Sequence, residues 1–281
     1  MNHFRKLCQQ HAKYLGKSLF SLALLVGLSS CTADELFKAI STSTKIEDNG
    51  DIKIFYEKTD DKIFQEIREV LVETNFFTNL ADGLNMALAF PINVMVFFDT
   101  CGEANAYYYP DVAEIVMCYE LIDSFLTIVE EEIETDEDFE DEVIDTSLFT
   151  FFHELGHALV DLYGLPITGK EEDAVDGFAT LVLLDVYDDD IGALSGMFQF
   201  HAEAQKEKQT LESFPFWDEH SLSSQRFYDI ACLIYGSDPN EFNFLIEEDY
   251  LPEERAVRCE EEYEQKSNAW KILIEPFLKL E

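Results

Sequence analysis

The sequence predicts an α+β fold, with a small sheet in the first half of the domain and a mostly helical C-terminal part. Short runs rich in β-branched and aromatic residues lie between residues 52 and 118. Further along the chain, apolar residues recur every three or four positions, which is the period of a helix. Hydrophobic residues make up 47% of the chain, which is enough for a folded core despite the high charge.

The first 30 residues have the composition of a bacterial export signal. They contain four basic residues and no acidic residue, and an apolar stretch runs from Leu19 to Leu28. This stretch is too short to span a bilayer. Leu28-Ser-Ser-Cys31 resembles a lipobox, in which Cys31 is the lipidated residue. A buried or amphipathic N-terminal helix is the alternative interpretation.

The lipobox resemblance implies an exported lipoprotein with three parts. These are a signal peptide at residues 1–30, lipidated Cys31 with a polar linker up to residue 50, and one domain at residues 51–281. The chain would then reach the membrane only through its lipid anchor, facing the periplasm or the cell surface. Thr32 replaces the Asp that often retains lipoproteins in the inner membrane, so we expect the outer membrane of a two-membrane bacterium.

The chain is strongly acidic, with 58 acidic and 19 basic residues and a net charge of −39. Binding to nucleic acid or to anionic lipid needs clusters of Lys and Arg, so neither is an expected partner. A negative field favours cationic substrates. Solubility or a salty habitat explains the charge equally well, and the sequence does not predict an oligomeric state.

Four strands are predicted in the first half of the domain. Ile52–Tyr56 is the first, and an amphipathic helix from about Asp60 to Phe77 follows it. Asn93–Phe98 is the second strand. Asn105–Tyr109 and Glu114–Cys118 are separated by a turn with Pro and Asp, so we expect them to pair as a hairpin.

A helix from Leu121 to Val129 is predicted to lead into an acidic stretch from Glu130 to Glu142. Ten of the thirteen residues in this stretch are acidic. Blocks of like charge are usually solvated, so we interpret the stretch as a solvated loop. A weak Ca²⁺ site is the alternative, but the ligand spacing of an EF-hand loop is missing.

His153-Glu-Leu-Gly-His157 has the spacing of a metal-binding pair. A helix is predicted from about Asp145–Ser147 to Gly164, because these apolar residues step by three or four: Leu148, Phe152, Leu155, Leu159 and Leu162. The two imidazoles then lie one turn apart on one face, as two ligands of a tetrahedral Zn²⁺, and Glu154 can act as general base. A chance pair of surface or core histidines is the alternative.

A second helix is predicted from about Lys170 to Tyr187, and Glu172 and Asp176 lie one turn apart on it. A catalytic zinc needs a third protein ligand and a carboxylate that orients a ligating His. We assign Glu172 to the first task and Asp176 to the second. Alternatively, both belong to a solvated acidic face. Two more helices are predicted at Gly192–Lys208 and Trp270–Leu280.

His-Glu-x-x-His followed by Glu-x-x-x-Asp resembles the gluzincin branch of zinc metallopeptidases. The stretch from His153 to Asp176 is similar to a bacterial metallopeptidase family of unknown function, and the similarity extends over most of the chain from about residue 50. Further stretches match that pattern: Cys101–Tyr107, Cys118–Glu120, His220–Arg226, Cys232–Gly236 and Cys259. The resemblance implies a zincin-like fold, in which a small mixed sheet packs on the active-site helix and an edge strand holds an extended substrate. The hairpin at 105–118 is our candidate for this edge, with an ordinary sheet as the alternative.

His220 and Arg226 resemble a His-Pro…Arg element of the prenyl-protein endopeptidase family of gluzincins, although Ser221 replaces the Pro. Hydrolysis of an amide needs a group that stabilises the oxyanion. His220 is the first candidate, Arg226 the second and Tyr228 the third. The alternatives are a helix cap, an ion pair and a core tyrosine, respectively.

Four cysteines remain once Cys8 leaves with the signal and Cys31 carries lipid. An even number in an exported domain favours two disulfides. Three pairings are possible, and we prefer the one that closes the hairpin and ties the C-terminal region, Cys101–Cys118 and Cys232–Cys259. A Cys₄ zinc site is disfavoured because no short C-x-x-C spacing is present.

Together these patterns predict a zinc-dependent endopeptidase that acts on a peptide or protein substrate. Zn²⁺ is the expected cofactor, bound by His153, His157 and Glu172, and Glu154 is the expected general base. Two other functions use the same residues. The first is a surface lipoprotein with structural zinc that serves as scaffold or adhesin, and the second is a zinc amidase that acts on a non-peptide amide.

Overall fold

The computed structural model describes residues 46–132, 139–207, 217 and 219–279. The expected signal peptide, Cys31 and the linker up to residue 45 lie outside these residues. Residues 46–50 are part of the folded unit, since the backbone N–H groups of Asn49 and Gly50 donate to the Phe90 carbonyl. No helix in the described part of the chain has the length and apolar character needed to cross a membrane.

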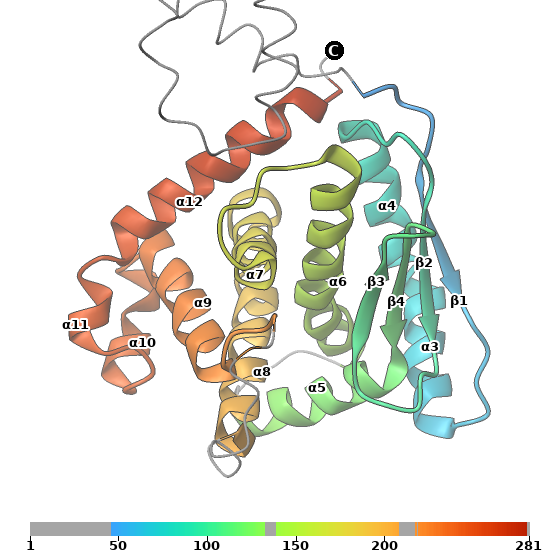
Figure 1. The fold of residues 1–281 in the computed structure, drawn as a ribbon. Helices are drawn as coiled ribbons and strands as arrows, with labels where there is room; N and C mark the ends of the chain where they lie inside the picture. Colours follow the sequence, from blue (N-terminus) through green and yellow to red (C-terminus); the bar gives the residue numbers. More distant parts are fainter. Residues whose placement is uncertain (1–45, 133–138, 208–216, 218, 280–281) are drawn as a thin grey trace, which may run out of the picture. The chain divides into compact units, whose positions relative to one another are not determined.

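Four strands form one mixed sheet in the order β1-β2-β4-β3 (Figure 1). β1 (Ile52–Tyr56) is parallel to β2 (Val94–Asp99), and β2 is parallel to β4 (Glu114–Cys118). β3 (Ala106–Tyr109) pairs antiparallel with β4 and forms an edge of the sheet. All four strands were predicted, and the expected hairpin is confirmed as β3–β4.

Two helices, α3 (Lys62–Thr74) and α4 (Phe76–Ala87), make the crossover between the parallel strands β1 and β2. We predicted a single helix from Asp60 to Phe77, which is wrong at its C-terminal end. Asn75 adopts φ 53°, a left-handed conformation that ends α3 and turns the chain into α4.

The acidic stretch is helical where it is described, which corrects our interpretation as a loop. Its first residues complete α5 (Tyr119–Glu132), and its last residues begin α6 (Phe139–Tyr163). Residues 133–138 lie outside the described part. The helix that carries the two histidines therefore begins earlier than the predicted Asp145–Ser147. It ends as predicted, at Gly164 with φ 60°.

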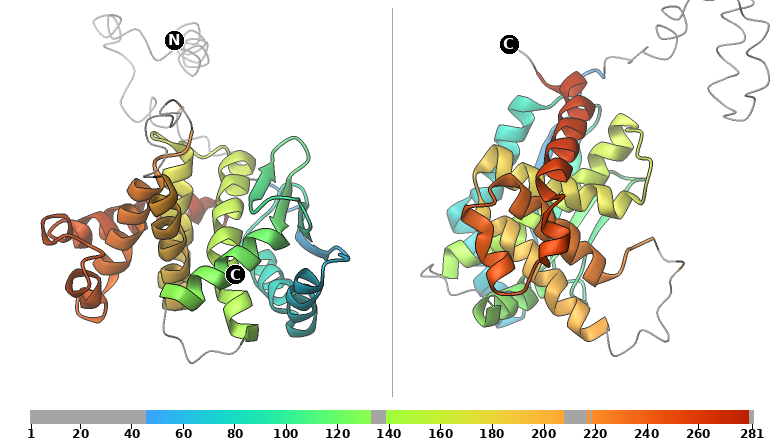
Figure 2. Two further views of the ribbon diagram at one scale, coloured as in Figure 1. Left: turned by 90° about the horizontal axis from the view of Figure 1, so that it is seen from below. Right: turned by 90° about the vertical axis from the view of Figure 1, so that its left-hand side faces the viewer.

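Helix α6 is the centre of the core. Apolar side chains on several of its sides are buried, among them Phe149, Phe151, Phe152, Leu155 and Leu159. α7 (Glu171–Val182) and α8 (Asp190–Glu207) pack against α6, and a π-helical turn, Leu183–Tyr187, connects them. Figures 1 and 2 show these three helices between the sheet and the C-terminal helices.

The C-terminal part is helical, as predicted, but its elements differ from the prediction. α9 (Ser223–Ser237) packs against α8 and α12 (Cys259–Ile274), and the short helices α10 (Phe244–Glu247) and α11 (Glu253–Ala256) lie between α9 and α12 in sequence. We expected the last helix at Trp270–Leu280. It begins much earlier, because the N-terminal half of α12 packs on α9.

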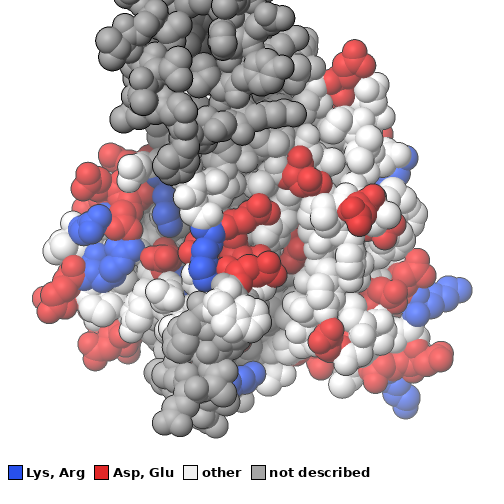
Figure 3. Space-filling view, viewed as in Figure 1, with Lys and Arg blue, Asp and Glu red and all other residues white. Residues whose placement is uncertain are grey.

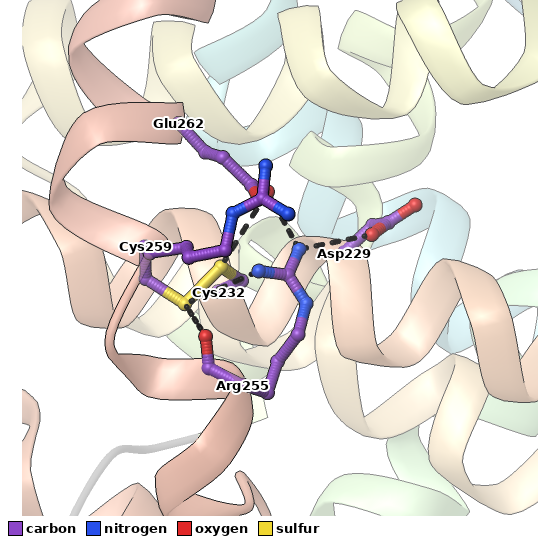
Figure 4. Close-up of a disulfide and its surroundings, with 6 residues drawn as sticks. Asp229, Cys232, Arg255, Cys259 and Glu262 are labelled. Carbon is purple, nitrogen blue, oxygen red and sulfur yellow. Dashed lines mark hydrogen bonds and ion pairs between the residues drawn. A yellow bond between two sulfur atoms is a disulfide. The ribbon is translucent and has the colours of Figure 1, made fainter.

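The two disulfides are the pairs that we preferred, Cys101–Cys118 and Cys232–Cys259. The second joins α9 to α12, and Figure 4 shows it beside Arg255, which donates to Glu262 at 2.6 Å. The bonds close segments with sequence separations of 17 and 27 residues. In a chain-entropy model, each contributes about 3 to 4 kcal/mol to stability.

Candidate metal centre and catalytic cleft

Three predicted metal ligands converge from two helices. His153 and His157 lie one turn apart on α6, and their Nε2 atoms are 3.3 Å from each other. Glu172, in the first turn of α7, places Oε2 3.3 Å from His153 Nε2 and Oε1 3.3 Å from His157 Nε2. The ligand atoms of these three residues all lie within 4.8 Å of one another.

A carboxylate fixes the orientation of each imidazole. Asp176 Oδ1 lies 2.8 Å from His153 Nδ1, and Glu171 Oε1 lies 2.8 Å from His157 Nδ1. Because an ionised carboxylate only accepts hydrogen bonds, each Nδ1 carries the proton and donates it. In this tautomer the Nε2 atom of each histidine carries a lone pair, and each lies 3.3 Å from a Glu172 carboxylate oxygen.

This arrangement brings three acceptor groups together, which is the condition for binding a cation. Glu172 Oε2 is buried and has no hydrogen-bond partner among the described residues. Without a bound cation, burial lowers the pKa of His153, but the neighbouring carboxylates of Asp176 and Glu172 outweigh that effect and raise the pKa to about 9, so a metal ion binds at Nε2 in competition with a proton. Two imidazole nitrogens and one carboxylate are the donor set of a catalytic zinc site. The residues present fit Zn²⁺.

Arg226 holds the carboxylate of Asp176 in place. Its Nε and Nη2 atoms donate to Asp176 Oδ2 and Oδ1, both at 2.6 Å. The guanidinium also lies 4.0 Å from the centre of the Phe200 ring. Burial raises the pKa of Asp176, but the Arg226 charge and the hydrogen bonds from Arg226 and His153 hold it below its ordinary value. Arg226, our second oxyanion candidate, is thus engaged by Asp176.

Glu154 follows His153 on α6 and borders the same cleft. Its residue is only 6% exposed, and burial raises the pKa of its carboxyl above the ordinary value, although the two neighbouring histidines oppose this rise. A raised pKa is typical of carboxyl groups that act as general acid or base. Its position beside His153 at the cleft keeps Glu154 the candidate general base.

A cleft of about 1030 Å³ opens over the metal centre. The edge strand β3 forms one wall with Tyr107, Tyr108 and Tyr109, and α8 contributes Phe200 and Glu203 to the lining. The Tyr108 hydroxyl donates to Asp161 of α6 at 2.8 Å, which ties the edge strand to the helix that carries the histidines. The hairpin that we proposed as the substrate edge thus lies at this cleft.

Of the three oxyanion candidates, His220 has the shortest contact with Glu172, at 3.3 Å compared with 3.9 Å for Arg226. It belongs to the connection before α9, lines the cleft, and places Nε2 3.3 Å from Glu172 Oε2. Its side chain is 47% exposed, so a substrate can reach it. Tyr228 is also partly exposed, but it does not belong to the cleft lining.

The sequence did not reveal several contributors to the site. Glu171 was overlooked as the partner of His157, although its place in the first turn of α7, next to Glu172, was a usable signal. A second group of possible ligand atoms among the described residues joins Cys101, Cys118 and Glu120. Those sulfurs form a disulfide, and Glu120 accepts hydrogen bonds from the backbone N–H groups of Cys101 and Gly102. This group is therefore structural.

Comparison with known families decides the class of protein. A family model, DUF4344, with the description "Putative metallopeptidase", matches residues 56–274, more than three quarters of the 281-residue chain. The chain belongs to this family. The matched region of this metallopeptidase family member contains the whole candidate metal centre and every residue that lines the cleft. No curated protein and no solved structure matches the chain.

Proposed function

We propose that this protein is a zinc-dependent endopeptidase that hydrolyses peptide bonds with Glu154 as general base. One observation carries the proposal: two imidazole nitrogens and a buried carboxylate converge, all as acceptors, at the floor of a large open cleft. A structural zinc site would be closed by four protein ligands, whereas this group supplies three.

The chain's own residues divide the chemical work. A bound zinc would supply Lewis acidity toward water and the scissile carbonyl. Glu154 takes the proton of the attacking water and delivers it to the leaving amine. His220 donates a hydrogen bond to the carbonyl oxygen as negative charge develops there. Asp176 and Glu171 keep the two imidazoles in the tautomer that binds metal.

An extended peptide is the substrate that the cleft suits best. β3 is an edge strand, so its outer backbone groups can pair with a substrate strand. The cleft volume of about 1030 Å³ is at the upper end of small-molecule sites, which suits a chain of several residues. These features support a peptide substrate over a small amide.

The test compares the purified protein with Glu154→Gln and His157→Ala. We expect one equivalent of zinc in wild type and in Glu154→Gln, and cleavage of a mixed peptide library by wild type alone. Glu154→Gln should lower kcat/KM by roughly 10²- to 10⁴-fold, since it removes a general base but no metal ligand. His157→Ala should lose both zinc and activity.

Each other outcome points elsewhere. Wild-type activity in Glu154→Gln would contradict the role of Glu154. Zinc without peptide cleavage in wild type would favour a structural metal or a non-peptide amide as substrate. Absence of zinc from wild type, after exposure to the metal, would overturn the metal centre itself.

A further inference from the structure

His220 lies at the metal centre although it belongs to a short connection rather than to a helix. It lies three residues before Ser223, where α9 begins. A side chain on such a segment keeps one position only if the backbone around it is anchored. The His220 imidazole nevertheless lies 3.3 Å from the ligand Glu172.

The N-terminus of α7 supplies two anchors for this connection. Lys170 Nζ donates to the carbonyl oxygen of His220 at 2.7 Å. Ser221 Oγ donates to Asp173 Oδ2 at 3.0 Å. Lys170 and Asp173 both lie within two residues of Glu172, so the start of the helix that presents the candidate metal ligand also holds the backbone of His220 and the side chain of Ser221.

Lys170 does not stabilise the N-terminus of α7, the helix that it precedes. It occupies the N-cap position of α7, where Ser, Thr, Asp or Asn would stabilise the helix, and its side chain makes no capping bond. A positive charge at this end also opposes the helix dipole. The stabilising contact of this lysine is therefore its hydrogen bond to the His220 carbonyl, which lies outside α7.

The far end of the connection is anchored as well. The backbone N–H of Ser223 donates to Glu207 of α8 at 3.0 Å. The backbone N–H of Leu222 donates to Gln225 at 3.3 Å in the first turn of α9. Contacts on both sides of His220 therefore limit the directions in which its backbone can move.

We propose that Lys170 and Ser221 are positioning residues that hold His220 at the metal centre, where its imidazole meets the substrate carbonyl. The activity readout rests on the proposed peptidase function, whereas the anchoring of the connection does not. Ser221 stands where a proline would stiffen the backbone by itself, and its bond to Asp173 performs the same task by a side-chain contact.

The experiment uses Lys170→Met and Ser221→Ala, with Lys170→Arg and Ser221→Thr as conservative partners that keep a donor. Lys58→Met, an exposed lysine outside the cleft lining, is the control. We expect full zinc content in all five. The first two should lose about 10- to 100-fold in kcat with little change in KM, which is also the result we expect for His220→Gln, because only positioning in the transition state is lost. The conservative partners should recover most of this loss.

A double-mutant cycle makes the inference specific. In a His220→Gln background, Lys170→Met and Ser221→Ala should lower kcat no further, because their effect passes through His220. A loss of kcat in that background equal to the loss in wild type would overturn the proposal.

A second readout does not need activity. Backbone amide exchange at residues 219–222 should become faster in Lys170→Met and Ser221→Ala, and should stay near wild type in Lys170→Arg and Ser221→Thr. If wild type cleaves no peptide, the proposed function fails, while faster exchange still supports the anchoring. Unchanged amide exchange at residues 219–222 in both Lys170→Met and Ser221→Ala would overturn the anchoring itself.

Discussion

The geometry of the metal centre depends on single hydrogen bonds to the sides of the ligands that face away from the metal. His153 contacts Asp176, Asp176 contacts Arg226, and the Arg226 guanidinium packs over Phe200. His153 and Asp176 are buried and the Arg226 side chain is only 10% exposed, so an unpaired group here would be costly. The orientation of His153 is therefore set by a residue on α9 that does not touch the imidazole.

Arg226→Met should lower zinc affinity by roughly 10- to 100-fold, because Asp176 loses both donors that hold it against His153. Arg226→Lys keeps the charge but cannot form the two parallel bonds, so its affinity should be intermediate. Competition with a chromophoric chelator measures the affinity. Arg255→Met is the matched control, since it removes an arginine paired with Asp229 and Glu262 away from the metal. Equal affinities in both Met variants would contradict the role of Arg226.

Glu203 of α8, which lines the cleft, should lower the free energy of unfolding at neutral pH. Burial raises the pKa of its carboxyl above the ordinary value, although the Arg226 charge opposes this. The folded protein thus holds the proton more tightly than the unfolded chain, and stability falls as pH rises from about 4.3 through the raised pKa.

Glu203→Gln should therefore raise the melting temperature at pH 8, and the gain should shrink toward pH 4. Thermal unfolding across this range measures it, with the exposed Glu253→Gln as a control that changes little. A variant less stable than wild type at pH 8 would show that the pairing of Glu203 with Arg226 outweighs its burial.

At the scale of elements, the site depends on how closely α7 approaches α6. Gly156, between the two histidines, makes this approach possible. A Cβ there would lie 2.9 Å from Val175 Cβ and 3.2 Å from Phe178 Cδ1, both on α7. Since Val175 Cβ is attached directly to the backbone, it cannot move away unless the helix moves.

Gly156→Ala should cost about 1 to 3 kcal/mol of stability and should also lower zinc affinity, because α7 carries Glu172 and Asp176. Gly83→Ala, inside α4, is the matched control. Nothing lies within 4 Å of its Cβ position, so this change should raise stability by about 0.5 to 1 kcal/mol. Denaturant unfolding and a zinc titration provide the two measurements. An unchanged zinc affinity in Gly156→Ala would show that α7 can move without disturbing its ligand.

The ends of the elements show where local sequence stops being informative. Gly164 was a readable stop because glycine adopts positive φ without strain, and α6 ends there. Asn75 adopts the same kind of conformation inside an amphipathic pattern, so the break between α3 and α4 was missed. The start of α6 was also missed, because its acidic residues resemble a solvated loop.

For the molecule as a whole, charge is the dominant property. The face in Figure 3 carries more acidic than basic side chains. The lining of the cleft includes Asp161, Glu171, Glu203, Glu207 and Glu219 in addition to Glu154 and Glu172. A negative field around a catalytic cleft attracts cations and repels anions. The lipid anchor at Cys31, by contrast, stays a prediction from the sequence.

Peptides with Lys or Arg near the cleaved bond should have a higher kcat/KM than matched peptides with Asp or Glu. The difference should shrink from low ionic strength to about 1 M salt, where the Debye length is roughly 3 Å. A neutral peptide provides the control for general effects of salt. Equal rates for acidic and basic peptides at low salt would instead assign the charge to solubility.

The sequence by itself determined the parts of this protein that depend on local periodicity. The spacing of His153, Glu154 and His157, and of Glu172 and Asp176, follows from one helical turn, so the candidate ligands were readable and the metallopeptidase family was recognised from them. The four strands were readable from their β-branched and aromatic composition, and the preferred cysteine pairs from their places in the chain. Only the tertiary structure decided three hydrogen bonds of the site. Glu171 accepts one from His157, Arg226 donates to Asp176, and Lys170 donates to the His220 carbonyl. Glu171 and His157 lie on different helices, and the other two pairs join residues 50 apart, so the packing of α6, α7 and α9 sets contacts that no local pattern encodes.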